Sequence, residues 1–211
     1  MKHDCIPDVT CCIGCGLKCP VGKDNKFESV LCENKKIAIW PEDNFFFTAS
    51  LNSLLLKKVE CHITEDVILV DFCIENILFF LNDSWIKKLS GFNMKIILIS
   101  DRKMKSMARY WFNRKEEISE FLVVGEGMEK FIHDAKKVLC GKKIDHRGIA
   151  EITEKEMDVL RLLAKGTAIN DISKKLGCPV KSIYNHQYSL CSKFGGLTRL
   201  DQLRLKHRVS W

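Results

Sequence analysis

Two glycines near the end of the chain constrain its fold more than any other feature. Gly166 and Gly177 each follow a short helix-forming run, and glycine at such a place is typical of a left-handed helix end. Thr153 and Glu156 have the spacing of a capping box, which predicts that a helix begins there. The residues after 152 are therefore predicted to form several short helices instead of one long helix.

The second and third of these helices predict a helix-turn-helix. The second covers about residues 169–176 and the third about residues 180–194, and a fourth is expected from Thr198. Polar residues follow one side of the third helix: Lys181, Ser182, Tyr184, Asn185, Gln187 and Tyr188. A polar second helix after a tight turn is the form that enters the major groove of DNA.

Positive charge gathers in the same part of the chain. From Val159 to Trp211 there are ten basic and two acidic side chains, a net charge of +8, whereas the whole chain of 211 residues has +7. A local excess of this kind favours a polyanionic partner. Together with the predicted helix-turn-helix, it indicates double-stranded DNA.

The residues from 152 to 195 resemble the DNA-binding domain of the LuxR/NarL family of bacterial transcription regulators. The similarity runs without a gap, and its longest segments are Ile152-Thr153-Glu154-Lys155-Glu156, Val159-Leu160-Arg161-Leu162-Leu163-Ala164-Lys165-Gly166 and Lys181-Ser182-Ile183-Tyr184-Asn185-His186. Pro179 and Ala168 are departures, because serine is usual at both helix starts in the family. The resemblance implies a four-helix DNA-binding domain.

The resemblance also implies which residues touch DNA. In the family, the middle of the recognition helix reads bases, and the matching positions are Tyr184, Asn185 and Tyr188. The positions that match phosphate contacts are Lys181, Ser182 and Lys193. The family pairs two DNA-binding domains through the last helix, so the resemblance implies a homodimer.

Other interpretations of these residues stay open. Tyr184 and Tyr188 lie one helical turn apart and could instead pack against a protein partner. His186 is more often a structural residue at its position than a base reader. The apolar residues of the last helix fit a dimer contact or a core equally well, and they are Leu200, Leu203 and Leu205.

Residues 37–140 predict an α/β domain. Short β-branched runs, typical of buried parallel strands, cover residues 66–71, 94–100 and 121–124. Helical patterns cover residues 45–56, 74–89, 105–114 and 128–139. This alternation predicts a doubly wound sheet. Residues 141–151 form the predicted linker to the helix-turn-helix domain, which takes residues 152–211.

The middle domain resembles a response-regulator receiver. Asp71 ends one predicted strand, where the family has its phosphorylated aspartate, and Ser100 ends the next. Glu42 and Asp43 stand where the family has the acidic pair that binds Mg²⁺. Phosphorylation of Asp71 is therefore one interpretation of this domain.

Two departures from the receiver pattern argue against phosphorylation. Val124-Gly125-Glu126 follows the third strand where the family has a lysine, so the cation that holds the phosphoryl group is missing. Only ten residues separate Leu56 from Val67, too few for the second strand and helix of a receiver. We therefore predict a degenerate, receiver-like domain that serves dimerisation or responds to a different signal.

Residues 37–205 further resemble orphan enterobacterial LuxR-type regulators of fimbriae and capsule, the common-pilus and mucoid-phenotype regulators. The similarity rests on the degenerate receiver and on two segments, Ile39-Trp40-Pro41-Glu42 and Ala108-Arg109-Tyr110-Trp111-Phe112-Asn113. It implies control of surface structures.

Cysteines gather at the start of the chain, where six of the 11 lie within the first 32 residues. The first residues are not followed by an apolar run, and no stretch of about 18 uncharged apolar residues occurs. We therefore expect a cytoplasmic protein that does not enter a membrane. Cysteines are mostly reduced in that compartment, which favours metal, cluster or redox chemistry.

Residues 1–36 are accordingly predicted to be a Cys-rich arm with a metal or cluster site. The cysteine spacing resembles the bacterial ferredoxin run with one cysteine removed, and the predicted iron–sulfur ligands are Cys12, Cys15, Cys19 and Cys32. Cys5 and Cys11 are alternatives to Cys32. The same thiolates could instead hold Zn²⁺, act as a thiol switch or bind nothing.

These features predict a sequence-specific DNA-binding regulator that binds as a dimer and is tuned through its N-terminal part. One alternative is a response regulator phosphorylated at Asp71. Another is a protein that no longer reads DNA and serves as a thiol–metal interaction partner or a heterodimer partner. The sequence shows no set of nucleophile, base and orienting residue, so it does not predict an enzyme.

Overall fold

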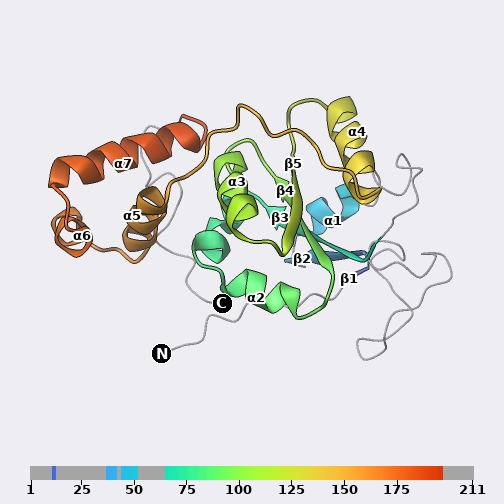
Figure 1. Ribbon diagram of the computed structural model, residues 1–211, viewed down its shortest axis with the longest axis horizontal. Helices are drawn as coiled ribbons and strands as arrows, with labels where there is room; N and C mark the ends of the chain where they lie inside the picture. The colour runs from blue at the N-terminus through green and yellow to red at the C-terminus, as the bar shows by residue number, and fades with distance from the viewer. Residues whose placement is uncertain (1–10, 13–36, 42–43, 52–64, 197–211) are drawn as a thin grey trace.

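Strand-forming and helix-forming segments alternate along this chain and build a five-stranded sheet with helices on both faces, followed by three helices (Figure 1). This computed structural model describes residues 11–12, 37–41, 44–51 and 65–196. The α/β part and the three C-terminal helices lie side by side and are joined by one extended segment (Figure 1).

The sheet has the strand order β1-β2-β3-β4-β5, and its strands are Cys11–Cys12, Ile37–Trp40, Val67–Phe72, Lys95–Ser100 and Ile118–Val123. Strands β2 to β5 are parallel, and β1 lies antiparallel to β2 at the edge. Every residue of β3 is buried. Helices cover both faces of this strand, which explains why its sequence is a continuous apolar run. The three predicted strands are confirmed.

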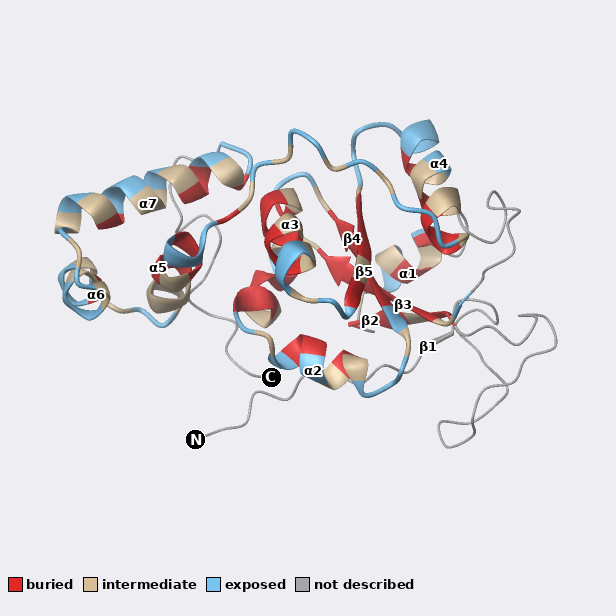
Figure 2. Ribbon diagram, in the orientation of Figure 1, coloured by how far each residue is buried: buried red, intermediate tan, exposed pale blue. Residues whose placement is uncertain are grey.

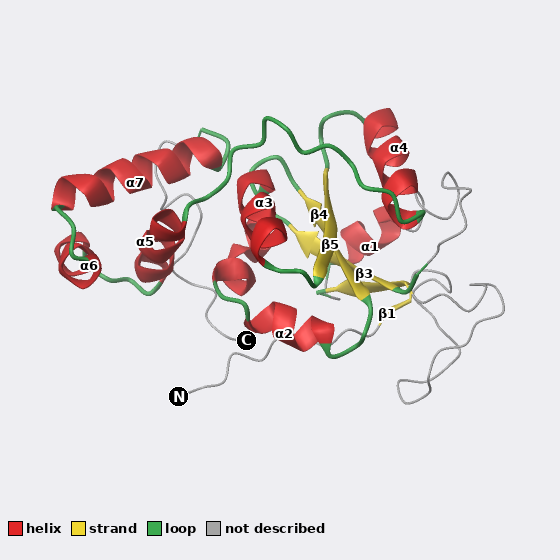
Figure 3. Cartoon of the chain, viewed as in Figure 1, coloured by secondary structure: helices red, strands yellow, loops and turns green. Residues whose placement is uncertain are grey.

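The helices divide between the two faces of the sheet (Figure 3). Helices α1 (Phe45–Leu51) and α4 (Met128–Leu139) pack on one face. The other face carries the 3₁₀-helix η4 (Ile74–Leu81), α2 (Ser84–Ser90) and α3 (Lys105–Arg114). The doubly wound arrangement is therefore confirmed. β2 pairs directly with β3, and β1 lies antiparallel on the other side of β2, at the edge where a flavodoxin-like order 2-1-3-4-5 has its parallel second strand.

The single helix predicted over residues 74–89 is wrong, because the structure contains η4 and α2 with a break between them. Asn82 at the break is extended, with φ −132° and ψ 174°. Its side-chain oxygen accepts a hydrogen bond from the Ser84 amide at 3.0 Å. Asparagine side chains compete with helical backbone bonds in this way. The apolar periodicity continues through the break and therefore conceals it.

The sequence pattern does not predict strands β1 and β2, which are short. In β1, Cys11 and Cys12 pair with Ile39 and Ala38. A piece of the Cys-rich arm thus forms the edge of the sheet. Strand β5 also begins before residue 121, because the charged but buried Glu120 interrupts the apolar pattern without ending the strand.

Three helices form the C-terminal unit: α5 (Glu154–Ala164), α6 (Ile169–Leu176) and α7 (Val180–Lys193). The predicted capping box is confirmed, since the Thr153 hydroxyl accepts from the Glu156 amide at 3.3 Å and the Glu156 carboxylate accepts from the Thr153 amide at 2.7 Å. Gly166 and Gly177 have the positive φ values, +74° and +61°, that helix ends of this type require. The helix predicted from residue 198 lies outside the described residues.

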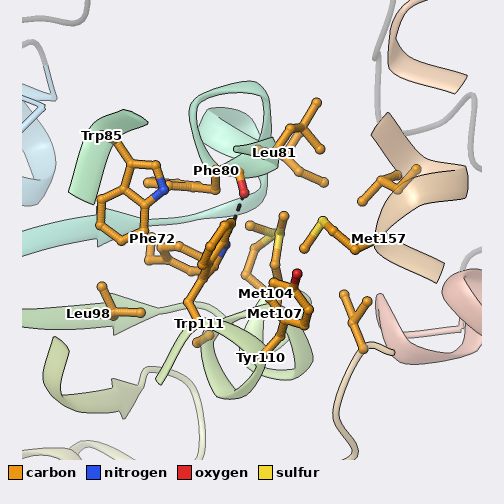
Figure 4. Packing of buried hydrophobic residues seen from close by; sticks show 14 of the residues in the cluster. Phe72, Phe80, Leu81, Trp85, Leu98, Met104, Met107, Tyr110, Trp111 and Met157 are labelled. Atoms are coloured by element: carbon orange, nitrogen blue, oxygen red, sulfur yellow. Dashed lines mark hydrogen bonds between the residues drawn. The ribbon is translucent and has the colours of Figure 1, made fainter. Parts of the chain in front are cut away.

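Aromatic rings fill the space between the sheet and the helices on the α3 face (Figure 4). The buried rings of Trp85 and Trp111 meet edge to face, with centroids 6.1 Å apart. Their N–H groups differ in one respect. Nε1 of Trp111 donates to the Phe80 carbonyl at 2.9 Å, whereas Nε1 of Trp85 has no hydrogen-bond partner among the described residues.

We predict that Trp111→Phe destabilises the protein more than Trp85→Phe does. Both substitutions remove the same ring volume from one cluster, but only Trp111→Phe leaves the buried Phe80 carbonyl without its donor. An unsatisfied buried acceptor costs about 1–3 kcal/mol. Urea unfolding should show a difference of that size between the two variants, and equal losses would contradict it.

Candidate nucleic-acid interface

A tight turn sets the direction of α7 relative to α6. Gly177 ends α6, and the Cys178 amide donates to the Ser173 carbonyl at 3.1 Å. The Ser173 hydroxyl in return donates to the Cys178 carbonyl at 2.6 Å. These bonds satisfy backbone groups that a helix end leaves free, and they fix the angle at which α7 leaves the turn.

Helix α7 has one buried side and one exposed side (Figure 2). The buried side consists of Ile183, Leu190 and Cys191. The exposed side carries Lys181, Tyr184, Asn185 and Tyr188, while Ser182 and His186 are half-buried. Tyr184 is 55% exposed and Tyr188 is 80% exposed. Two large side chains this exposed on one helix mark a contact surface. All six predicted DNA contacts lie on α7, and five of them lie close together between Lys181 and Tyr188.

The sixth, Lys193, is engaged inside the domain. Its ammonium lies 2.6 Å from the Glu156 carboxylate, and the two side chains are only 17% and 5% exposed. The Ser189 hydroxyl donates to the same carboxylate at 2.6 Å. Sequence similarity assigns Lys193 to a phosphate, whereas the structure assigns its charge to Glu156. We therefore treat Lys193 as a structural residue.

Glu156 joins the beginning of α5 to the end of α7. Burial raises the pKa of its carboxyl, but the hydrogen bonds from Lys193 and Ser189 outweigh burial, so the pKa lies below the ordinary value of 4.5. The carboxylate is therefore ionised at neutral pH. It holds together two helices that are far apart in the sequence, and it thereby fixes where the exposed side of α7 points.

Two lysines outside the predicted set add positive charge near this surface. Lys174 and Lys175 are exposed in the last turn of α6, directly before the turn that leads into α7. Cations in the last turn also stabilise a helix, so their sequence position alone does not distinguish a DNA contact from a helix end. Their exposure in the structure makes them available to phosphates.

The receiver-like domain keeps its aspartate, but the carboxyl is enclosed. Asp71 is 3% exposed at the end of β3. Nδ2 of Asn44 donates to its Oδ2 at 2.7 Å, and Nδ2 of Asn76 donates to the same oxygen at 3.3 Å. Burial raises the pKa of Asp71 above 3.8, and the hydrogen bonds from Asn44 and Cys73 offset only part of this rise.

The charges that act on Asp71 are acidic. Within the described residues they are Glu75 and Asp101, and each raises its pKa further. The carboxylate of Asp101 is itself occupied, because it accepts from the amides of Ile74 and Met104 at 2.9 and 2.7 Å. No cation among the described groups offsets these charges at Asp71, in agreement with the missing lysine.

The other receiver positions have structural contacts or lie outside the described residues. The Ser100 hydroxyl donates to the carbonyl of the next residue at 2.9 Å. The guanidinium of Arg102 hydrogen-bonds to the Gly125 carbonyl, in the loop where a receiver has its lysine. Glu42 and Asp43, the expected Mg²⁺ ligands, belong to the residues that the structure does not describe.

Most of the predicted cluster ligands also lie outside the described residues. Cys12 and the alternative ligand Cys11 are the described ones, both in β1, whereas Cys5, Cys15, Cys19 and Cys32 are not described. Within the described ranges, no group of three potential metal ligands occurs. None of the described helices is long and apolar enough to cross a membrane.

Comparison with known families accounts for both parts of the chain. Residues 11–139 match the EcpR N-terminal domain, and residues 150–203 match the bacterial regulatory proteins of the luxR family. The chain belongs to the EcpR N-terminal domain family. We refer to residues 11–139 as the EcpR-type domain and to residues 150–203 as the luxR-type domain.

Individual proteins are similar to the chain over most of its length. The uncharacterized protein YqeH of Escherichia coli (strain K12) is 25% identical over 185 residues, 88% of each chain. RcsB from Salmonella enterica serovar Typhimurium, solved bound to promoter rprA, is 18% identical, with 77% of this chain and 96% of that chain covered at a TM-score of 0.38. A structure of two RcsB dimers bound to two parallel DNAs is 20% identical, with 75% and 79% covered and a TM-score of 0.38.

We predict that Glu156→Gln destabilises the luxR-type domain in a pH-dependent way. The substitution leaves the Lys193 ammonium without its partner, which should cost about 2–4 kcal/mol at pH 7. Because the pKa of Glu156 is lowered in the folded state, its stabilisation is present above pH 4.5 and is lost as the pH falls through the lowered value. Urea titrations at several pH values should therefore converge for variant and wild type in acid. Glu129→Gln, at an exposed position on α4, is the matched control.

We predict the opposite trend for Asp71→Asn. The pKa of Asp71 is raised in the folded state, so its contribution to stability is fully present below pH 3.8 and is lost as the pH rises through the raised value. Asparagine keeps an oxygen acceptor for Asn44 and Asn76 without the buried charge. Urea unfolding should give the variant a higher free energy of unfolding than wild type at pH 7, by about 1.4 kcal/mol for each unit of pKa shift, with the difference vanishing in acid. Lost DNA binding by the well-folded variant would favour the phosphoacceptor role.

Proposed function

We propose that the chain is a DNA-binding transcription regulator that recognises specific sequences through α7. The observation that carries this proposal is that α7, the second helix of the helix-turn-helix, has an exposed polar side and a buried apolar side. The luxR family assignment of the same residues supports it. The +8 charge of residues 159–211 supplies the attraction to phosphates that such binding needs.

The side chains of α7 divide by chemistry into base and phosphate contacts. Asn185 is exposed and has the amide that pairs with adenine in the major groove. Tyr184 and Tyr188 flank it and offer both ring surface and hydroxyl groups to base edges. Lys181 and Ser182 lie in the first turn of α7, where a cation and a hydroxyl can reach the DNA backbone. We assign bases to the first group and phosphates to the second.

Asn185→Ala should weaken specific binding while leaving non-specific binding nearly unchanged. The loss should be about 1–3 kcal/mol on a duplex selected by the wild-type protein and small on a random duplex. Lys181→Ala is the matched comparison, since it should weaken both duplexes alike and flatten the salt dependence by about one unit. Fluorescence anisotropy titrations at several salt concentrations distinguish the two patterns. If Asn185→Ala lowers both affinities equally, it does not read bases.

We further propose that the regulator binds DNA as a homodimer. Helix-turn-helix proteins commonly read two half-sites about one helical turn apart, so one copy of α7 would cover half of the operator. The Asp71 carboxyl of the EcpR-type domain is enclosed by Asn44 and Asn76, which argues against phosphorylation there. We therefore assign pairing or reception of a different signal to this domain. We propose that the chain acts in the cytoplasm. From its resemblance to pilus and capsule regulators, we propose that it controls surface structures.

The Cys-rich arm is the proposed source of the signal. We propose an iron–sulfur cluster held by Cys12, Cys15 and Cys19, with Cys32 as the fourth ligand. The spacing of these cysteines supports the proposal, because thiolates separated by short turns reach one centre at little ordering cost. Cys12 also lies in β1, which is hydrogen-bonded to the sheet, so a cluster ligand would be attached directly to the EcpR-type domain.

Anaerobic purification tests this assignment. We expect a brown protein with iron and sulfide that air bleaches, and Cys12→Ser, Cys15→Ser and Cys19→Ser should abolish the colour. Cys178→Ser is the control, because Cys178 lies in the α6–α7 turn and should leave the metal content unchanged. A colourless protein with stoichiometric zinc would assign the site to zinc, and a protein with neither metal would reduce the arm to reactive thiols.

A further inference from the structure

The luxR-type domain packs against the EcpR-type domain through a continuous contact. Figure 4 shows Met157 of α5 pointing toward Met104 and Met107, which lie at the beginning of α3. All three side chains are fully buried, and Leu81 of η4 closes the cluster at 9% exposure. Apolar side chains of both domains therefore share one core, and separating the domains would expose it to water.

A polar network at the edge of this core centres on Arg114, the last residue of α3. Its Nε lies 2.6 Å from the Glu154 carboxylate, and its Nη1 pairs with Glu151. The Tyr110 hydroxyl donates to Glu154 at 2.8 Å, and the Arg114 guanidinium lies 4.1 Å from the Tyr110 ring centroid. Nδ2 of Asn113 donates to Glu151 at 2.6 Å. One arginine thus holds both the end of the connecting segment and the beginning of α5.

Hydrogen bonds to backbone carbonyls extend the same interface to the recognition helix. The Ser106 hydroxyl of α3 donates to the carbonyl of Lys193, the last residue of α7, at 3.2 Å. The Ile152 amide donates to the Ser106 carbonyl at 3.4 Å. On the other side of α5, Nε of Arg161 donates to the Leu81 carbonyl at 2.6 Å. Helix α7 is therefore attached to α3 directly as well as through α5.

The connecting segment is also held on the EcpR-type domain. Arg109 of α3 donates to the Ile149 carbonyl at 2.9 Å and hydrogen-bonds to the His146 carbonyl. The His146 ring stacks on Phe121 with centroids 3.7 Å apart, and its Nε2 pairs with the buried Glu120 of β5. Residues 141–151 form neither helix nor strand, yet these bonds give the segment a defined path.

This packing leaves the reading surface free. The exposed side of α7, with Tyr188 80% exposed, is not covered by the EcpR-type domain (Figure 2). The contact with α3 uses the end of α7 and the side of α5. The interface therefore fixes a direction for α7 without blocking it.

We propose that Arg114, together with Glu151 and Glu154, positions the recognition helix relative to the EcpR-type domain, and so sets the half-site spacing that a dimer accepts. This inference rests on the proposed function. In a dimer that pairs through its EcpR-type domains, two recognition helices meet two half-sites simultaneously only when each has the right orientation in its own chain.

The apolar and polar contacts have different roles in the interface, and their exposure indicates which contact has which role. The side chains of Arg114, Glu151 and Glu154 are 31%, 29% and 58% exposed, and ion pairs this exposed contribute little to folding stability. These ion pairs instead set the relative orientation of the two domains, because a guanidinium binds carboxylates at defined angles. The buried methionines hold the domains together but are flexible and tolerate sliding. Removal of Arg114 should therefore loosen the orientation without unfolding either domain.

The test uses the full chain and duplexes that the wild-type protein selects from a random library. The selected sequence should contain two half-sites at one spacing. Inserting about five base pairs, half a helical turn, should lower wild-type affinity at least about tenfold. Arg114→Ala should bind the selected and expanded duplexes within about threefold of each other. The preference of Arg114→Lys for the selected duplex should lie between that of wild type and that of Arg114→Ala, because lysine keeps the charge without the forked geometry.

Lys130→Ala is the matched control, since it removes a cation that pairs with Glu126 on α4, away from the interface. Amide hydrogen exchange gives a readout without DNA: the Ile152 amide should exchange faster in Arg114→Ala, while the sheet amides stay unchanged. If Arg114→Ala keeps the wild-type spacing preference, the positioning role is overturned and the proposed function stands. If wild type selects isolated half-sites, the positioning role and the proposed homodimer both fail, while DNA reading by α7 stands. If wild type selects no sequence, the proposed function fails and this inference fails with it.

Discussion

Helix α3 packs against the sheet on one side and against α5 on the other, and the arrangement of both domains depends on this shared contact. Met104 and Met107 are fully buried at the place where the two domains meet. The next turns of the same helix carry Tyr110 and Arg114, which contact Glu154 at the first turn of α5. A single helix therefore supplies apolar area and polar geometry to the same interface, and the extended segment between the domains follows the path that this contact allows.

Two buried carboxyls show how their neighbours decide the role of an acidic residue. Glu156 meets an ammonium and a hydroxyl, so its charge is favoured and it joins α5 to α7. Asp71 meets side-chain amides and lies near further acidic groups, so its charge is disfavoured. A receiver needs a solvent-accessible aspartate beside a metal and a lysine. The enclosure of Asp71 by Asn44 and Asn76 instead makes it part of the core at the carboxyl end of the sheet.

The same separation of buried and exposed groups explains the proposed reading surface. The luxR-type domain uses Glu156 and Lys193 inside, where their mutual attraction is strong because water is excluded. It leaves Lys181, Asn185 and Tyr188 outside, where DNA can reach them. Lys193 thus stabilises the domain itself, whereas Lys181 remains accessible to DNA, although both lysines belong to α7.

Local chemistry determined much of this protein from sequence alone. The capping box at Thr153, the positive φ of Gly177 and the apolar runs of the central strands depend on near neighbours, so the helical unit and the parallel sheet are predictable. Interactions between distant residues decided the rest. The pairing of Lys193 with Glu156 and the contact of α3 with α5 arise only when segments far apart in sequence meet, and periodicity carries no information about such contacts. Sequence therefore determined the central strands and the helices of the C-terminal unit, and the tertiary structure decided which of their charges are used inside and which remain for DNA.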